Sequence, residues 1–399
     1  MIHDAVIVGA GPAGLAAAAA LRQGGNGDVV VVERDAAPGG VPRWCAHPGF
    51  GLRDCHRPMT GPAYAAALVR RARGIDMRLD TTVLALEPGG RLRISTPAGL
   101  ETIAGRAVLL ASGIRETPRA ARLVSGTRPW GVTTTGAFQE IVQATGRAPF
   151  RRPLIVGSEF VSFSNLLAAR HAGVRPVALI EVAAAPLVPW PVPLLARLLG
   201  GARLLTRTTL AEIRGAERVE AVVLRGPEGE RVLACDGVIF SGAFVPEAVL
   251  ARAGALRIDP GTAGPTIDQF WRCSDPACFA AGNVLRAVES AGRSAAEGRA
   301  AAAAMIRALR GDLPPPEPAV PLRAEGRLRY AMPQRLIAED AMVTVHARAA
   351  LPGRGVLRLL ADGVPVASRR VHARTGALLS IRIHAARLRG CTALAAVLE

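Results

Sequence analysis

The chain has 399 residues, half of them hydrophobic, so it is long enough for more than one domain with a sizeable core. Its 49 basic residues are all arginine and outnumber the 32 acids, but they are scattered and accompany no nucleic-acid-binding motif. We therefore expect no nucleic-acid partner and ascribe the charge to a bias towards Ala, Arg and Gly. No apolar run approaches the ~20 residues of a membrane span. We also find no basic leader, and we predict a cytoplasmic protein without a transmembrane or targeting segment.

A strand, a glycine loop, a helix and a second strand follow one another at the start of the chain. The strand covers 5–8, the loop 9–14 is Gly-Ala-Gly-Pro-Ala-Gly, the helix covers 15–21, and the second strand 29–32 ends at Glu33. Alanine is the best helix former and fills most of the helix. This order predicts a dinucleotide-binding βαβ unit, because the glycine loop is framed by two apolar strands and an acid.

Each glycine of this loop has a physical role in such a unit. Gly9 permits the tight turn, Gly11 lets the backbone approach a pyrophosphate, and Gly14 lets helix and strand pack closely. The helix N-terminus offers unpaired N–H groups to the phosphates. Glu33, nineteen residues after Gly14, is placed to accept hydrogen bonds from a ribose.

The pattern of the next segments predicts loops, a helix and several strands. Glycine and proline make 34–51 too irregular for a regular element. We predict a helix over 62–73, a strand over 82–86, a hairpin-like pair over 91–96 and 99–103, and a separate buried strand over 107–113.

A second βαβ pattern lies in the middle of the chain. A strand over 153–156, a turn over 157–162, a helix over 163–171 and a strand over 177–180 lead to Glu181. The interval from Gly157 to Glu181 is 24 residues, the same as from Gly9 to Glu33. Two units with one spacing predict an α/β chain with two Rossmann-like dinucleotide-binding domains.

The last part of the chain changes character after a proline-rich linker at 313–318. Before the linker we predict buried strands at 234–242 and from Cys278 towards Asn283, and a long helix over 289–308. Beyond it, alternating runs with an Asp362-Gly363 turn predict a small C-terminal all-β domain. The predicted runs are 342–347, 355–360, 364–371, 378–383 and 392–398.

Six cysteines are too few and too dispersed for a disulfide framework. Their spacing to histidines matches no metal ligand set, so we predict no metal site. Cys273 and Cys278 have the spacing of a redox pair, but Cys278 opens a buried strand, which favours small core residues.

With these residues in view, the chain resembles the pyridine nucleotide–disulfide oxidoreductase superfamily, the flavoproteins with two dinucleotide-binding domains. Within it, four stretches resemble FAD subunits related to hydrogen cyanide synthase and opine oxidase, and reductases associated with glycerol-phosphate-type dehydrogenases. The stretches are 39–51, 112–118, 126–131 and 282–289. The resemblance implies a discontinuous FAD-binding domain (1–118 and 243–310), an inserted NAD(P)-binding-like domain (119–242) and a C-terminal β domain (319–399).

The resemblance also implies which residues bind FAD. Glu33 would hold the adenosine ribose, and Val83 the adenine edge through its backbone. The pyrophosphate, ribityl and flavin contacts would come from Gly9, Gly11, Pro12, Ala13, Gly14, Arg34, Gly40, Ala111, Ser112, Gly113, Gly282, Asn283 and Ala291. The helix near Ala291 would point its N-terminus at the flavin pyrimidine.

Two departures from the superfamily pattern bear on the second cofactor and on catalysis. In the second loop Glu159 and Ser162 replace glycines, and a carboxylate there opposes a pyrophosphate, so we expect weak or absent NAD(P)H binding. Cys45 has no partner at disulfide spacing, since Cys55 is ten residues away.

Arg43, Cys45 and His47 follow the Gly39-Gly40 loop and are the candidate catalytic residues. His47 could relay a proton and Arg43 could bind an anion. The alternative is that all three stabilise an irregular loop.

The leading hypothesis is the flavoprotein subunit of a heteromeric dehydrogenase. It would oxidise a small amine, amino acid or hydroxy compound and pass electrons to a partner [2Fe-2S] protein beside a partner dehydrogenase subunit. The alternatives are a self-contained NAD(P)H-dependent flavin reductase and a non-catalytic FAD-binding assembly subunit. The arginine-rich β domain is expected to serve the assembly of subunits rather than FAD binding. The alternative is that it forms a self-contained cap on the FAD-binding domain.

Overall fold

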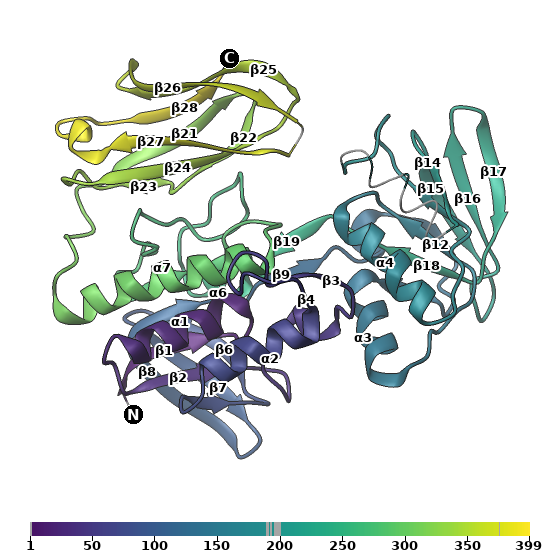
Figure 1. Cartoon of the computed structure of the whole chain (residues 1–399), viewed down its shortest axis with the longest axis horizontal. Coiled ribbons are helices and arrows are strands. Elements are labelled where there is room, and N and C mark those ends of the chain that lie inside the picture. The colour runs from purple at the N-terminus through teal and green to yellow at the C-terminus, as the bar shows by residue number, and fades with distance from the viewer. Residues whose placement is uncertain (1, 189–190, 192–193, 195–200, 375) are drawn as a thin grey trace. The chain divides into compact units, whose positions relative to one another are not determined.

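The computed structural model describes residues 2–188, 191, 194, 201–374 and 376–399. Its contacts group the chain into two compact units (Figure 1). The first contains Met1–Gly40, Ala65–Ile114 and Pro246–Glu399, and the second contains Val41–Tyr64 and Arg115–Val245. No helix in the described part of the chain is both long and apolar enough to cross a membrane.

A seven-stranded sheet forms the centre of the first unit, in the order β5-β2-β1-β8-β7-β6 with β20 beside β8. The glycine loop leads from β1 into α1, and α1 lies against α7 (Figure 1). The central strands are buried because valine, isoleucine and leucine fill them. The elements are β1 (Ile2–Val8), α1 (Pro12–Gln23), β2 (Val29–Val32), α2 (Gly61–Arg71), β5 (Asp76–Arg78), β6 (Thr82–Glu87), β7 (Arg91–Thr96), β8 (Gly99–Leu110), α6 (Val249–Ala253), β20 (Cys278–Ala280) and α7 (Ala291–Arg310).

The strand β8 differs from the sequence prediction, which divided it into two strands. The first half of β8 pairs antiparallel with β7, and its second half pairs parallel with β1 and β20. The polar and small residues 104–106 interrupt the apolar pattern, but β1 pairs with this stretch and keeps it extended. Pairing with distant strands therefore overrides the local pattern.

The C-terminal β domain consists of two sheets, in the orders β23-β21-β28-β25-β26 and β22-β24-β27. The five predicted runs are strands, and Asp362 and Gly363 both have positive φ in the tight turn between β25 and β26. The sequence analysis missed β21, β22 and β23. The strands are β21 (Val320–Gly326), β22 (Leu328–Met332), β23 (Arg335–Leu336), β24 (Met342–Ala349), β25 (Gly353–Ala361), β26 (Val364–Ala373), β27 (Leu378–His384) and β28 (Leu394–Leu398).

The C-terminal domain packs directly onto the rest of the first unit. Tyr330 and Met332 of β22 belong to the same buried cluster as Val8 and Leu110 of the central sheet. The N–H of Ile267 also donates to the Gln334 side chain at 3.0 Å. The two parts therefore share a hydrophobic core.

The second unit contains a parallel sheet in the order β11-β18-β12-β13-β14 and an antiparallel sheet that includes β15, β16 and β17. The predicted second βαβ pattern is present as β12, α4 and β13. The elements are β3 (Pro48–Phe50), β4 (Met59–Thr60), β10 (Ser125–Gly126), β11 (Val132–Thr134), α3 (Thr135–Thr145), β12 (Pro153–Val156), α4 (Phe160–His171), β13 (Ala178–Ile180), β14 (Arg203–Leu205), β15 (Thr209–Arg214), β16 (Ala221–Gly226), β17 (Gly229–Ala234) and β18 (Gly237–Phe240). The segments β9 (Ile114–Glu116) and β19 (Phe244–Pro246) carry the chain between the units. The α/β prediction with two Rossmann-like folds and a C-terminal β domain is confirmed.

Candidate functional site

The first glycine loop is shaped by close backbone contacts. Gly9 has φ +106°, and a Cβ there would lie 2.7 Å from the carbonyl oxygen of Ala111. A Cβ at Gly14 would collide with the carbonyl oxygen of Gly9. A Cβ at Gly11, the residue before α1, would meet no atom within 4 Å. The loop is therefore tight on its protein side and open at Gly11, the position where a pyrophosphate approaches in such folds.

The side chain of Glu33, the residue after β2, stabilises the loop by accepting hydrogen bonds from its backbone. Its side chain is buried, with 8% exposure, and accepts hydrogen bonds from the N–H of Ala10 at 2.7 Å and of Asp35 at 3.0 Å. The N–H of Thr81 donates to the Glu33 carbonyl at 2.9 Å, which brings the segment leading to Val83 beside the acid. Arg34 is exposed. The carboxylate keeps free lone pairs for a ribose hydroxyl, since each oxygen accepts one bond from the protein.

Two further predicted segments lie against the same loop. A Cβ on Gly40 would be 2.9 Å from Cα of Gly11, and the N–H of Gly39 donates to Ala10 at 2.8 Å. Ala111 donates to Val8 at 2.9 Å as the chain leaves β8. Ser112 and Gly113 follow it, and both bond to the backbone of Glu247.

The segment 282–291 is the last of the predicted segments that lie against the first glycine loop. Gly282 has φ +79°, and a Cβ there would be 2.9 Å from the Cβ of Ala13. The side-chain amide of Asn283 donates to the carbonyl of Glu289 at 3.2 Å and accepts from its N–H at 2.7 Å. Asn283 thus closes its own loop, a role that the sequence analysis did not foresee. The helix α7 begins at Ala291, close to the expected position.

Two buried charged residues beside this segment escaped the sequence analysis. Arg286 is 1% exposed and pairs with Glu297 of α7, and Glu297 also accepts a bond from the N–H of Gly282 at 3.2 Å. The sequence did contain a signal for this pair. Arg286 is a single arginine among apolar residues, and Glu297 is the single acid in an alanine-rich helix. A lone charge in an apolar setting requires a buried partner.

The candidate catalytic residues Arg43, Cys45 and His47 belong to the second unit. The guanidinium of Arg43 lies 4.7 Å from the ring centroid of Trp44, and His47 Nδ1 is 2.9 Å from the Pro48 carbonyl oxygen. Cys45 is buried, and its Sγ lies 3.4 Å from the side-chain oxygen of Gln139. Burial raises the pKa of Cys45 to about 12. The thiol is therefore neutral near pH 7, whereas a nucleophilic cysteine needs a lowered pKa.

The second glycine loop is held by side-chain hydroxyls. Ser162 donates to Ser241 at 2.8 Å beneath the loop. Ser158 donates to the Glu181 carboxylate, which also accepts from the N–H of Ala183 at 2.9 Å. Glu181 is 8% exposed, like Glu33. The acid at the strand end is retained in both units.

Glu159 stands at the position of the second glycine of this loop, just before α4. Its carboxylate lies against Gly242, where it would collide with an added Cβ, and accepts a bond from the N–H of Ala243 at 3.3 Å. Burial raises the pKa of Glu159, partly offset by that backbone bond and by Arg122. Arg122 also donates to the Gly242 carbonyl at 2.8 Å. The carboxyl group of Glu159 and the guanidinium of Arg122 thus both lie next to the second glycine loop.

Cys273 and Cys278, which have the spacing of a redox pair, are core residues. Cys273 and Cys278 are buried in the central core, and burial raises the pKa of the Cys278 thiol to about 12. The N–H of Cys273 donates to the Cys278 carbonyl at 2.8 Å. No group of three or more His, Cys, Asp or Glu side chains in the described ranges is arranged to hold a metal ion.

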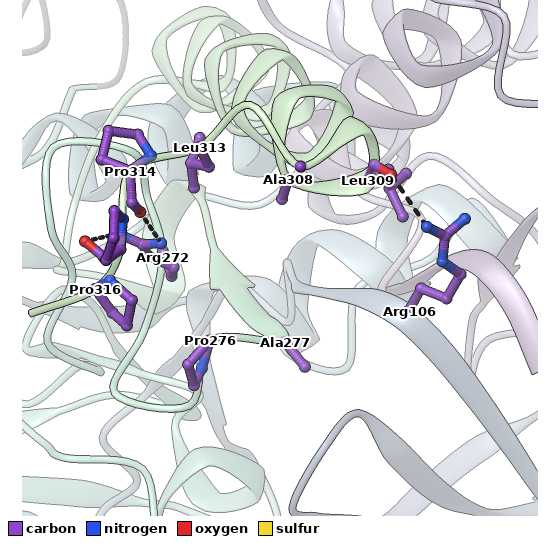
Figure 2. Close-up of a pocket in the computed structure, with 11 residues that line it drawn as sticks. Arg106, Arg272, Pro276, Ala277, Ala308, Leu309, Leu313, Pro314 and Pro316 are labelled. Atoms are coloured by element: carbon purple, nitrogen blue, oxygen red, sulfur yellow. Dashed lines mark hydrogen bonds between the residues drawn. The ribbon is translucent and has the colours of Figure 1, made fainter.

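A surface pocket of about 390 Å³ lies at the C-terminal end of α7 (Figure 2). Ala291 is at the opposite end of this helix. Its two guanidinium groups already have partners. Arg106 donates to the Leu309 carbonyl at 3.0 Å, and Arg272 donates to the Pro314 carbonyl at 2.8 Å (Figure 2). The pocket is therefore separate from the converging segments around the first glycine loop.

Comparisons with known proteins agree with this geometry. Residues 3–298 match the family described as pyridine nucleotide-disulphide oxidoreductase. An opine oxidase subunit of Rhizobium meliloti (strain 1021) is 31% identical over 188 residues, which cover 46% of this chain and 40% of that protein. The alpha chain of sarcosine oxidase from the same organism is 27% identical over 361 residues, covering 83% of this chain and 33% of that protein. The chain thus spans well under two thirds of either relative.

Among solved structures, thioredoxin reductase of T. acidophilum superposes with a TM-score of 0.65 at 19% identity, covering 77% of this chain and 98% of that one. This likeness concerns the fold. The glycine loop, its bracing acid and the converging segments suit a flavin dinucleotide, because they leave an open path at Gly11. The chain belongs to the pyridine nucleotide-disulphide oxidoreductase family, and its cofactor is FAD.

Proposed function

We propose that this chain is the flavoprotein subunit of a heteromeric dehydrogenase that oxidises an amine, an amino acid or a hydroxy compound. Electrons would leave to a partner iron–sulfur protein. The observation that carries the proposal is the second glycine loop, where Glu159 replaces a glycine before α4 and its carboxylate lies against Gly242 beside the loop. A reductase that takes electrons from NAD(P)H needs the second glycine of this loop free for a pyrophosphate. We therefore infer that the electrons come from an organic substrate.

The first unit would bind FAD through the residues that surround its glycine loop. Gly9, Gly11 and Gly14 set the backbone path, Glu33 accepts from the ribose, and the N-terminus of α7 at Ala291 offers its positive dipole end. FAD, when bound, accepts a hydride equivalent and can release electrons singly. The protein's part is to bind, orient and exclude water.

The heteromeric assembly is supported by the names of the relatives, each of which is one component of a multi-subunit oxidase. Those proteins act on opines and on sarcosine according to their names, and both are secondary amines. We therefore place secondary amines and their amino acid relatives first among candidate substrates.

The test is anaerobic mixing of the purified holoprotein with a panel of secondary amines, amino acids and hydroxy acids, and separately with NADH and NADPH. We expect bleaching of the flavin band by a member of the organic panel, with the partner subunits present, and slow or no bleaching by the nucleotides. Rapid bleaching by NADH at micromolar concentration, with no response to the panel, would overturn the proposal.

A self-contained NAD(P)H-dependent flavin reductase is the second candidate. One observation favours it: Glu181 remains buried at the end of β13 and retains the geometry of a ribose acceptor. If this candidate holds, NADH should be preferred over NADPH, because Glu181 would repel a 2′-phosphate.

A further inference from the structure

A buried cluster of charges lies at the beginning of α7. Arg286 lies between two carboxylates, with its Nη atoms on Glu297 and its Nε 3.4 Å from Glu289. Arg293 lies 3.5 Å from Glu297 and 3.7 Å from Glu289. The side chains of both acids are less than 10% exposed. Such pairs are expensive to bury, and the loss of one partner leaves an uncompensated charge.

The C-terminal β domain supplies a third guanidinium to this cluster. Arg348 of β24 donates to Glu289 at 2.6 Å, to the hydroxyl of Tyr330 at 2.7 Å and to the Gly376 carbonyl at 3.0 Å. Its side chain is 15% exposed. Burial raises the pKa of Tyr330, so the phenol stays neutral and the cluster has three guanidinium groups against two carboxylates. The Arg348 side chain thus connects two strands of the C-terminal domain, β22 and β24, to Glu289 in the segment before α7.

The same two acids also hold the backbone of that segment. The Glu297 carboxylate accepts a hydrogen bond from the N–H of Gly282, and the backbone N–H and carbonyl of Glu289 are both hydrogen-bonded to the side chain of Asn283. Gly282 in turn lies against Ala13 at the start of α1. A continuous series of contacts therefore joins Arg348 to the first glycine loop.

We propose that Arg348 is a positioning residue through which the C-terminal β domain holds residues 282–291 in the conformation that binds FAD. The inference rests on the proposed function, because it takes this segment as part of the FAD site. Its consequence is reciprocal coupling: a loosened C-terminal domain weakens FAD binding, and bound FAD stabilises the C-terminal domain. The expectation that this domain is unrelated to FAD binding would then be wrong.

The first experiment measures the dissociation constant of FAD on deflavinated full-length protein, by flavin fluorescence. Arg348→Ala should weaken binding by about tenfold, within the usual range of such couplings. Arg348→Lys should recover part of the loss, since the ammonium keeps the positive charge near Glu289 but lacks the planar fork with which the guanidinium spans three separate acceptors. Arg358→Ala is the matched control, because Arg358 makes an exposed ion pair with Glu399 on the same domain. It should leave the constant unchanged.

A double-mutant cycle tests whether Arg348 acts through Glu289. If it does, Glu289→Gln alone should weaken FAD binding, and Arg348→Ala should add less in the Glu289→Gln background than in the wild type. Fully additive losses would mean that Arg348 acts by another route and would overturn the proposal.

A second measurement covers the case in which Arg348→Ala fails to fold. Hydrogen exchange of the wild-type protein should slow in 320–349 when FAD is added. Tyr330→Phe, which removes a single bond to Arg348, should reduce that protection. Unchanged exchange on FAD addition, or equal FAD affinity in folded Arg348→Ala and wild type, overturns the inference. A wild-type protein that binds no FAD would instead overturn the proposed function.

Discussion

Gly11 and Gly27 are two glycines of the first βαβ unit at which a side chain meets no atom within 4 Å. Gly11 precedes α1 in the glycine loop, whereas Gly27 lies in the exposed turn before β2. A new side chain is therefore tolerated sterically at both places. A carboxylate at residue 11 would enter the pyrophosphate path, and one at residue 27 would enter water.

Gly11→Glu should give folded, colourless protein, with FAD affinity lowered by more than about a hundredfold, or ~2.7 kcal/mol. Gly27→Glu should remain yellow with unchanged affinity. The measurements are the flavin absorbance of purified protein and fluorescence titration of the apoprotein. Equal flavin content in the two variants would mean that the pyrophosphate does not approach residue 11.

Cys45 should resist alkylation in the native protein. Its thiol pKa, raised to about 12 by burial, leaves almost no thiolate at pH 8. Cys391 is only half-buried and serves as an internal control in the same molecule. Mass spectrometry after iodoacetamide treatment should find Cys391 modified and Cys45 modified only after denaturation. Early labelling of Cys45 in the native protein would show that its thiol is accessible and ionised despite its burial.

At the scale of elements, the two βαβ units share one frame and differ in their loops. Both end the second strand with a buried acid that holds the loop, Glu33 in one and Glu181 in the other. The loops differ at the second glycine, which is Gly11 in the first unit and Glu159 in the second. The third glycine differs as well, since Ser162 stands where the first unit has Gly14. The first loop is therefore open at Gly11, whereas the second has a carboxylate beside it.

Glu159→Gly should open the second loop and raise the affinity for ADP or NADH by about tenfold, or ~1.4 kcal/mol. Glycine is acceptable at the start of a helix, so the cost to α4 is small. Calorimetric titration measures the affinity, and Glu140→Gln on the exposed side of α3 is a control for a lost charge. No gain in affinity would show that the carboxylate is not the obstacle.

Because burial raises the pKa of Glu159, the effect of its carboxylate on nucleotide binding should depend on pH. As pH falls through the folded-state pKa, the carboxyl becomes neutral, so residual nucleotide binding should strengthen at acid pH. The same protonation favours the folded state, and this contribution to stability is lost as pH rises through the folded pKa. Glu159→Gln should remove both trends. A pH trend that persists in Glu159→Gln would assign it to another group.

At the scale of the whole molecule, the first unit has one core that reaches from the central sheet into the C-terminal β domain. Met332 and Tyr330 are buried in the cluster that contains Val8 and Leu110. The C-terminal domain also has a core of its own between its two sheets. The shared core predicts that the two parts unfold together.

Met332→Ala should lower the free energy of unfolding by about 2–5 kcal/mol, as expected for a buried methionine. Met342→Ala is the control, because Met342 is half-exposed in the same domain, and it should stay within about 0.5 kcal/mol. Denaturant unfolding followed by flavin fluorescence and by far-ultraviolet dichroism measures both. Separate transitions for the β domain and the flavin would contradict a shared core.

Local patterns in the sequence were sufficient for the first glycine loop, Glu33, both βαβ frames and most C-terminal strands. A glycine at a tight turn or an alternating strand is specified by neighbours in the chain, so its signal is readable without the fold. The turn at Asp362-Gly363 is of this kind, because its backbone conformation suits these two residue types.

Tertiary structure alone decided the features that depend on residues distant in sequence. The continuity of β8 depends on pairing with β1, and the contact of Cys45 with Gln139 joins residues 94 positions apart. The Arg286, Glu289 and Arg348 cluster joins segments about sixty residues apart. Charges are tolerated in a core only where a partner arrives from elsewhere, and a linear pattern does not show which partner arrives.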